Sequence, residues 1–266
     1  MNEQLKISKL LEKLTIDTFP RTLMLLGEKG CGKHTLLKII SDKFDLKVND
    51  ITGNISLDTI QQIQLTVEPA IYVIDCNNIK VRDENIILKF LEEPLKNSFI
   101  ILLCEYKEGL LPTILNRCQI WQFESYSERF LSTFFEDNID EDKKKLILHI
   151  SRTPGDIKYY QYLDLQPIYD LCVNIFTKMQ VANVANEISI KDKIAFKNEK
   201  DKFDTQTFFR MLLYVCREMF LNNNISSKIY VITLELLKDL NTYNADKQML
   251  FENYILKLKG IDNLWI

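Results

Sequence analysis

The first 125 residues alternate short apolar runs with longer segments whose apolar residues recur at helical spacing. Continuous apolar runs are typical of buried strands, and a repeat of three to four residues is typical of amphipathic helices. Strands are predicted at residues 23–26, 46–51, 70–74, 99–103 and 114–123. Helices are predicted at residues 5–14, 35–43, 57–65 and 85–91. This order predicts an α/β fold with a parallel sheet that helices cover on both faces.

The strand signal fades after residue 125, and the remainder of the chain has the pattern of helices. Helices are predicted at residues 127–135, 142–151, 156–163, 168–181, 186–198, 205–221, 227–240 and 245–259. The run Arg152-Thr153-Pro154-Gly155 is a break, and Gln166-Pro167 marks a second boundary. The chain is therefore predicted to contain three domains, at residues 1–125, 126–165 and 166–266.

Three of the seven glycines fall in one run between the first predicted strand and the next helix. They are Gly27, Gly30 and Gly32, and Lys33 follows directly. A strand, a loop of the Gly-x-x-x-x-Gly-Lys type and a helix form a phosphate-binding loop, whose backbone N–H groups hold phosphates. Glycine allows positive φ and close approach of a ligand, and the lysine reaches the β- and γ-phosphates. We therefore predict a nucleotide-binding loop here.

The residue types around this loop depart from those that support hydrolysis. The Ser or Thr that binds Mg²⁺ after the lysine is replaced by His34, and Thr35 comes one position later. Asp75 ends a predicted strand, where a carboxylate can hold nucleotide-bound Mg²⁺, but Cys76 follows it instead of a glutamate base. These residues therefore give little support for a bound Mg²⁺ ion. The residues leave open whether the loop holds ATP or ADP as a structural ligand; His34, Thr35 and Asp75 are its candidate contacts beside the loop.

Composition narrows the remaining classes of function. Apolar residues make up 46% and charged residues 27% of the chain, and the formal net charge is −3. DNA contact would therefore need a local patch or partner subunits. The six cysteines form no C-x-x-C pair, so we expect no zinc site. No apolar stretch long enough for a membrane span and no secretory signal are visible, so we expect a cytoplasmic protein without a membrane partner.

Two further segments carry a family resemblance. Leu88-Lys89-Phe90-Leu91-Glu92-Glu93-Pro94 and the later Leu110-Leu111-Pro112-Thr113-Ile114-Leu115-Asn116-Arg117-Cys118 resemble the AAA+ subunits of DNA-polymerase clamp loaders. In that family a leucine-rich helix ends in Glu-Glu-Pro, and a later Leu-Pro-x-x-Leu-x-Ser-Arg-Cys segment carries an arginine finger. Here Asn116-Arg117-Cys118 stands for Ser-Arg-Cys. The resemblance implies that Arg117 reaches the ATP of a neighbouring subunit in trans, a role suited to a planar, permanently charged guanidinium.

The resemblance also implies an architecture and a set of partners. The fold would be an AAA+ P-loop core (1–125), a small helical lid (126–165) and a helical collar for oligomerisation (166–266). Partners would be ATPase subunits of the gamma/tau type and a delta-type subunit in a ring, a sliding clamp, and primer-template DNA through the assembly. The lid should present a basic residue after Pro154-Gly155, and the chain has Asp156 there.

Two main hypotheses follow from these residues. The first is a non-catalytic subunit of a sliding-clamp loader in DNA replication, whose own ATPase site is degenerate and whose Arg117 acts on a neighbour. The second is an ATP-hydrolysing clamp-loader subunit of the gamma/tau type, or a related AAA+ ATPase, in which Thr35 takes the metal. A third, weaker hypothesis is a nucleotide-gated helicase loader, against which the 111–118 segment argues.

Overall fold

The computed structural model describes residues 4–77, 79, 81–92, 98–108, 110–178, 194–195, 203–240 and 246–259. The chain divides into two compact units. The first comprises Met1–Glu136 and Arg152–Lys158, and the second comprises Asp137–Ser151 and Tyr159–Ile266. Among the described helices, none combines the length and the apolar character that a membrane span requires.

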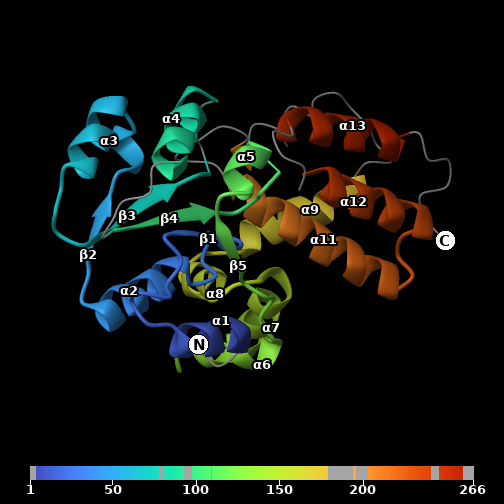
Figure 1. Cartoon of the computed structure of the whole chain (residues 1–266). Coiled ribbons are helices and arrows are strands. Elements are labelled where there is room, and N and C mark those ends of the chain that lie inside the picture. Colours follow the sequence, from blue (N-terminus) through green and yellow to red (C-terminus); the bar gives the residue numbers. More distant parts are fainter. Residues whose placement is uncertain are drawn as a thin grey trace. The chain divides into compact units, whose positions relative to one another are not determined.

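The first unit is built on a five-stranded parallel sheet (Figure 1). Its strands are β1 (Thr22–Leu26), β2 (Lys47–Asp50), β3 (Ala70–Asp75), β4 (Phe99–Cys104) and β5 (Gln119–Gln122). Their order across the sheet is β2-β3-β4-β1-β5. The carboxyl ends of β3, β4 and β1 are therefore neighbours at one edge of the sheet, where open α/β sheets bind ligands.

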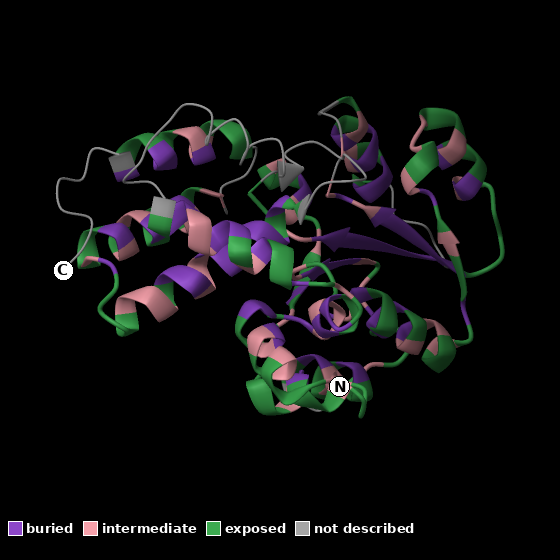
Figure 2. Ribbon diagram, turned by 180° about the vertical axis from the view of Figure 1, so that it is seen from behind, coloured by how far each residue is buried: buried purple, intermediate pink, exposed green. Residues whose placement is uncertain are grey.

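Helices cover both faces of this sheet, as the apolar runs predict (Figure 1). The elements are α1 (Leu5–Lys13), α2 (Lys33–Phe44), α3 (Leu57–Gln64), α4 (Val81–Glu92) and α5 (Pro112–Leu115), with a 3-10 turn at Thr52–Asn54. Leu23 and Leu25 of β1 pack in the cluster that includes α1 and α2. Met24 and Leu26 pack in the cluster on the other face, with α3 and α4. Alternate residues of each strand thus fill opposite cores, and the central strands are buried along their length (Figure 2).

The rest of the first unit is short and helical. It consists of α6 (Glu128–Leu131), a 3-10 turn (Ser132–Phe134) and the beginning of α8 (Pro154–Tyr160). The predicted helix at 127–135 is therefore two shorter pieces. The predicted strand at 114–123 is also shorter, because its first part is the helix α5, which begins at Pro112 and is followed by β5.

The second unit is mainly helical, as predicted. Its elements are α7 (Glu141–Ile150), α9 (Gln166–Lys178), β6 (Ile194–Ala195), β7 (Phe203–Asp204), α11 (Thr205–Leu221), α12 (Ser227–Leu240) and α13 (Lys247–Lys259). α11 contacts α7, α9 and α12, and α12 contacts α13. At its centre the Thr233 hydroxyl lies 2.9 Å from the Tyr254 hydroxyl and donates to the Ile229 carbonyl at 2.8 Å. Buried polar groups are thus paired inside an apolar bundle.

One predicted helix in the second unit is wrong where it can be compared. Residues 194–195, inside the helix predicted at 186–198, form β6 and pair in parallel with β7. Residues 186–193 and 196–198 of that predicted helix lie outside the described residues. Glu93 and Pro94 of the Glu-Glu-Pro segment also lie outside them.

Candidate functional site

The glycine run forms the connection from β1 to α2. Gly30 (φ 80°) and Gly32 (φ 102°) have the left-handed backbone that glycine adopts without steric cost. A side chain at Gly27 would meet Cys31 Sγ at 2.8 Å and Phe123 Cβ at 2.9 Å. Gly32 caps α2 and has no side chain that could hydrogen-bond to the start of that helix. The loop therefore has the backbone geometry and the helix N-terminus of a phosphate site.

The lysine of the loop is turned inward. Lys33 is 7% exposed, and its Nζ donates to the carbonyl oxygens of Gly27 and, at 3.1 Å, of Glu28. These carbonyls satisfy a buried ammonium in the free protein. A bound phosphate would have to replace them as the partner of Lys33.

The tip of the loop is held by the segment 152–155, which belongs to the same unit. The Gly155 N–H donates to the Gly30 carbonyl at 3.1 Å, and the Thr153 hydroxyl donates to the Lys29 carbonyl at 3.1 Å. An ion pair of 3.3 Å joins Arg152 and Glu28. A Cβ on Gly155 would lie 2.5 Å from the Gly30 Cα, so the two backbones are in direct contact.

Asp156, in the place where a basic residue would face a phosphate, serves the start of α8 instead. Its carboxylate accepts the N–H groups of Arg152 (2.9 Å) and Thr153 (3.0 Å), and its own N–H donates to the Thr153 hydroxyl at 3.2 Å. This reciprocal capping suits an acidic residue at a helix N-terminus. The side chain therefore stabilises the segment that holds the loop.

Asp75, predicted beside the loop, lies at the carboxyl end of β3. Its Oδ1 accepts the Asn77 N–H at 2.9 Å, and its N–H donates to the Thr52 hydroxyl at 2.8 Å. The next residue, Cys76, is 7% exposed, and burial raises the pKa of its thiol far above the ordinary value. A neutral, buried thiol cannot act as the base that activates water.

Glu105 stands at the carboxyl end of β4, between Asp75 and the loop in the order of the sheet. Burial raises the pKa of Glu105; Lys33 opposes that shift and Asp75 adds to it. The Glu105 N–H donates to the Asn77 side-chain oxygen at 2.7 Å. The structure thus brings Lys33, Asp75 and Glu105 within electrostatic reach of one another, and two of the three are carboxylic acids.

His34 and Thr35 differ in what they face. Both are exposed residues in the first turn of α2. Thr35 lines a cavity of about 280 Å³ beside the loop, whereas His34 does not. Within the described residues, no group of three or more His, Cys, Asp or Glu side chains could hold a metal ion. An imidazole at the hydroxyl position and a neutral thiol after Asp75 do not fit Mg²⁺, which prefers hard oxygen ligands.

The cavity beside the loop has an aromatic wall. The rings of Tyr126 and Phe130 are stacked at 5.3 Å, and Phe134 meets Phe130 edge-on at 5.2 Å. The Lys158 ammonium lies 5.9 Å from the centre of the Phe134 ring, and the Tyr126 hydroxyl donates to the Cys31 carbonyl at 2.6 Å. The sequence interpretation missed these aromatic residues, although their spacing of four residues is a signal it could have used.

Arg117 lies far from this site, at the amino ends of the parallel strands. It follows α5 and precedes β5, and its carbonyl accepts a hydrogen bond from the hydroxyl of Thr22, the first residue of β1. The loop begins at the other end of β1. The Arg117 guanidinium pairs with Glu92 at 2.7 Å and donates to the Thr113 carbonyl at 3.1 Å. The side chain is 37% exposed, so it remains accessible.

A family model and a curated relative both match DNA polymerase III subunits. The family described as "DNA polymerase III, delta subunit" matches residues 36–127. A curated relative, DNA polymerase III subunit delta' of Haemophilus influenzae, is 24% identical over 141 residues. That match covers 48% of this chain and 43% of the relative, so it spans less than half of the relative's length.

Two solved structures from Thermotoga maritima resemble the whole chain at 16% identity. One is a DNA polymerase III gamma subunit-related protein, with a TM-score of 0.46 over 97% of this chain and 98% of that one. The other is the RuvB Holliday junction branch migration motor, with a TM-score of 0.49 over 96% and 86%.

Proposed function

We propose that this chain, a DNA polymerase III clamp-loader-type subunit, is a non-catalytic subunit of the delta-prime kind. It would assemble into a ring with ATPase subunits of the gamma/tau type and a delta-type subunit in the cytoplasm. In that ring it would supply Arg117 to a neighbour's ATP and help to load a sliding clamp onto primed DNA. Packing of its C-terminal helices into a collar would hold the ring together.

The position of Arg117 carries this proposal. The residue borders the first residue of β1, while the phosphate loop begins after the last. The strand between them is on the order of 15 Å long, at roughly 3.3 Å per residue. Arg117 therefore lies well away from the nucleotide site of its own chain, as an arginine that acts in trans must. Its pair with Glu92 is at the surface and holds it only weakly, since exposed ion pairs contribute roughly 0–1 kcal/mol.

The state of the chain's own site supports the non-catalytic half of the proposal. His34 replaces the metal-binding hydroxyl, and Cys76 is a buried neutral thiol. Glu105 places a second carboxyl group near Asp75, and Asp156 caps its own helix. Turnover needs groups at these positions that bind metal, orient water and stabilise the charge of the phosphates, and the residues present are of other types.

ATP or ADP as a bound but unhydrolysed ligand is a separate part of the proposal. The glycine geometry, the open start of α2 and the aromatic cavity favour a nucleotide. The lysine held by carbonyls and the contact of Gly155 with Gly30 oppose it. Any binding would stabilise the first unit by linkage without turnover, so the shift of thermal unfolding by millimolar ADP measures it directly.

The test is the DNA- and clamp-stimulated ATPase rate of a reconstituted loader in which only this chain is changed. Arg117→Ala should lower the rate clearly with assembly intact, and Arg117→Lys should restore little, because a lysine lacks the planar fork. In phosphoryl transfer such a finger contributes roughly 10³–10⁵ in rate, but only one of several sites would lose it. Arg129→Ala, at an exposed position of α6, is the matched control and should leave the rate unchanged.

Three results would overturn the proposal. An unchanged rate with Arg117→Ala would make the arginine structural. DNA-stimulated hydrolysis by the purified chain alone, abolished in Lys33→Ala, would establish the alternative of an ATP-hydrolysing subunit. Failure to assemble with gamma/tau-type and delta-type subunits would remove the chain from clamp loading altogether.

A further inference from the structure

The strand β2 leaves one edge of the sheet open. Among the described strands β2 pairs only with β3, and the Ile51 N–H donates to the Val73 carbonyl at 3.0 Å. In a parallel pair, alternate residues direct both main-chain groups toward the same neighbour. The N–H and C=O groups of Val48 and Asp50 therefore point away from β3. No other described group pairs with them, and β2 is largely exposed.

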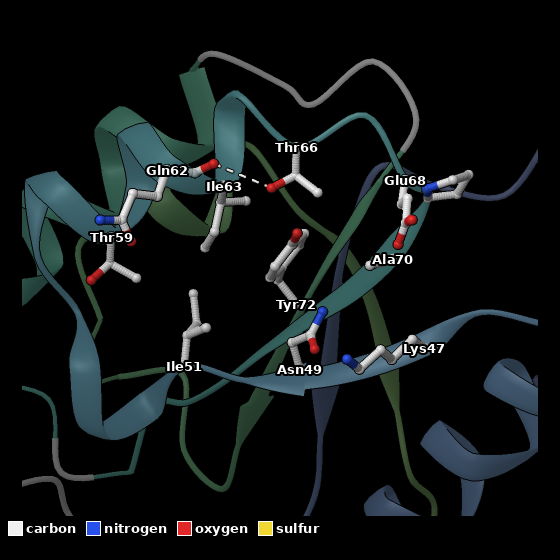
Figure 3. A pocket seen from close by; sticks show the side chains of 11 residues that line it. Lys47, Asn49, Ile51, Thr59, Gln62, Ile63, Thr66, Glu68, Ala70 and Tyr72 are labelled. Carbon is white, nitrogen blue, oxygen red and sulfur yellow. Dashed lines mark hydrogen bonds between the residues drawn. The ribbon is translucent and has the colours of Figure 1, made fainter.

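A cavity of about 370 Å³ lies between this edge and α3 (Figure 3). Its apolar floor includes Ile51, Ile63 and Tyr72, which come from the end of β2, from α3 and from β3. Its rim is polar and includes Lys47 and Glu68. An apolar floor with a few polar groups at the rim is the usual composition of a ligand pocket, and the volume is at the small end of that class.

One polar group, the Tyr72 hydroxyl, reaches the accessible space of this cavity. Tyr72 is 5% exposed, and its hydroxyl is directed from the sheet toward α3 (Figure 3). Within the described part of the chain, that hydroxyl makes no hydrogen bond. The cavity therefore offers one unused donor and acceptor at its apolar floor.

The loop that follows α3 exposes apolar side chains next to the cavity residues Thr66 and Glu68. Leu65 is 82% exposed and Val67 is 81% exposed. Two large apolar residues at nearly full exposure in one short loop are typical of a contact surface. The rim residues Lys47 and Glu68 carry opposite charges, so the mouth favours a ligand without strong net charge over a polyanion.

We propose that β2 and this cavity bind an extended peptide segment of a partner protein. The segment adds a strand to the sheet through the main-chain groups of Val48 and Asp50. One of its side chains, with an apolar body and a polar tip, enters the cavity and bonds the Tyr72 hydroxyl. In this kind of recognition the main chain supplies affinity and a side-chain pocket supplies specificity. The proposal does not depend on Arg117 or on the phosphate loop.

The experiment is a selection of displayed random heptapeptides on the full-length chain. Enriched sequences should alternate β-branched with polar residues around one large apolar or tyrosine side chain. Synthetic copies should bind with shifts of the Val48 and Asp50 amide signals in NMR spectra. N-methylation of alternate peptide amides should weaken binding at least tenfold in one register and little in the other.

Two substitutions on α3 separate the cavity from the rest of the surface. Gln62→Trp places a bulky ring at the exposed rim and should weaken binding at least tenfold. Gln61→Trp, on the neighbouring exposed position outside the cavity, should not change it. Tyr72→Phe removes only the unpaired hydroxyl and should weaken peptides with a polar tip severalfold while leaving the thermal unfolding temperature almost unchanged.

Three outcomes would overturn the proposal. The first is no enrichment over an unrelated protein. The second is enriched peptides that bind Gln62→Trp as well as the wild type. The third is binding that tolerates N-methylation at every position, which would point to a helical or side-chain-only ligand.

Discussion

The contact between Gly155 and Gly30 leaves no room for a methyl group, and Gly155→Ala measures how firmly α8 holds the phosphate loop. The new Cβ would lie 2.5 Å from the Gly30 Cα and 3.2 Å from its oxygen. Ordinary contact begins at 3.4 Å, so the two backbones must part by about 0.9 Å. That shift would stretch the 3.1 Å hydrogen bond from the Gly155 N–H to about 4 Å, beyond bonding range.

The magnitude follows from two contributions. A lost hydrogen bond costs about 1 kcal/mol, and overpacking of a rigid contact costs about 1–3 kcal/mol. We expect Gly155→Ala to lower the free energy of unfolding of the first unit by about 2–4 kcal/mol. For a unit of this size, a loss near 3 kcal/mol lowers the unfolding temperature by roughly 6–12 °C.

The assay is urea unfolding followed by the fluorescence of Trp121, which is buried in the first unit. The chain has two tryptophans, so a Trp265→Phe background isolates this signal. Gly53→Ala is the matched control: a Cβ there meets nothing within 4 Å, and the change should be neutral or stabilise by up to about 1 kcal/mol. If Gly155→Ala lies within about 0.5 kcal/mol of the wild type, the segment 152–155 does not hold the loop.

Three further predictions concern charge and thiol chemistry. Glu92→Gln should release Arg117 at a cost of less than about 1 kcal/mol in urea unfolding, since the pair is exposed; a larger loss would make the pair structural. Burial raises the folded-state pKa of Glu105 above 4.5, so the folded chain binds more protons there and its stability falls as the pH rises through that range. Glu105→Gln should therefore be more stable than the wild type at pH 7 and nearly equal to it below pH 4; a constant difference at both pH values would contradict the shift. Burial raises the pKa of Cys104 to about 11 and that of Cys118 to about 12, so iodoacetamide at pH 7.5 should label these thiols only after unfolding, as mass spectrometry of native and urea-treated chain would show; rapid labelling of the native chain would refute this.

The local elements and the loop could be predicted from the sequence because their causes are local. The apolar runs at 23–26, 70–74 and 99–103 became β1, β3 and β4 with small changes at their ends. Fully apolar strands can be buried only between two layers of helices. Gly30 and Gly32 do take the positive φ that the phosphate-loop pattern requires.

The prediction failed where a neighbour in space decides the conformation. Residues 194–195 pair with β7, and strand pairing overrides the helical pattern of a short segment. The residues that hold the loop were also missed as a group. Nothing in the local pattern around Thr153 and Gly155 says that they will contact Lys29 and Gly30, more than 120 positions earlier.

The residue types that argue against hydrolysis are fixed by the sequence, since no fold can turn His34 into a hydroxyl or Cys76 into a carboxylate. Only the tertiary structure decided which groups meet. It placed Asp75 and Glu105 beside Lys33 by the strand order β3-β4-β1. It placed Arg117 at the amino ends of the strands of the same sheet, and it directed the Tyr72 hydroxyl into a cavity. These facts depend on strand order and helix packing, which bring together residues that the linear pattern leaves unrelated.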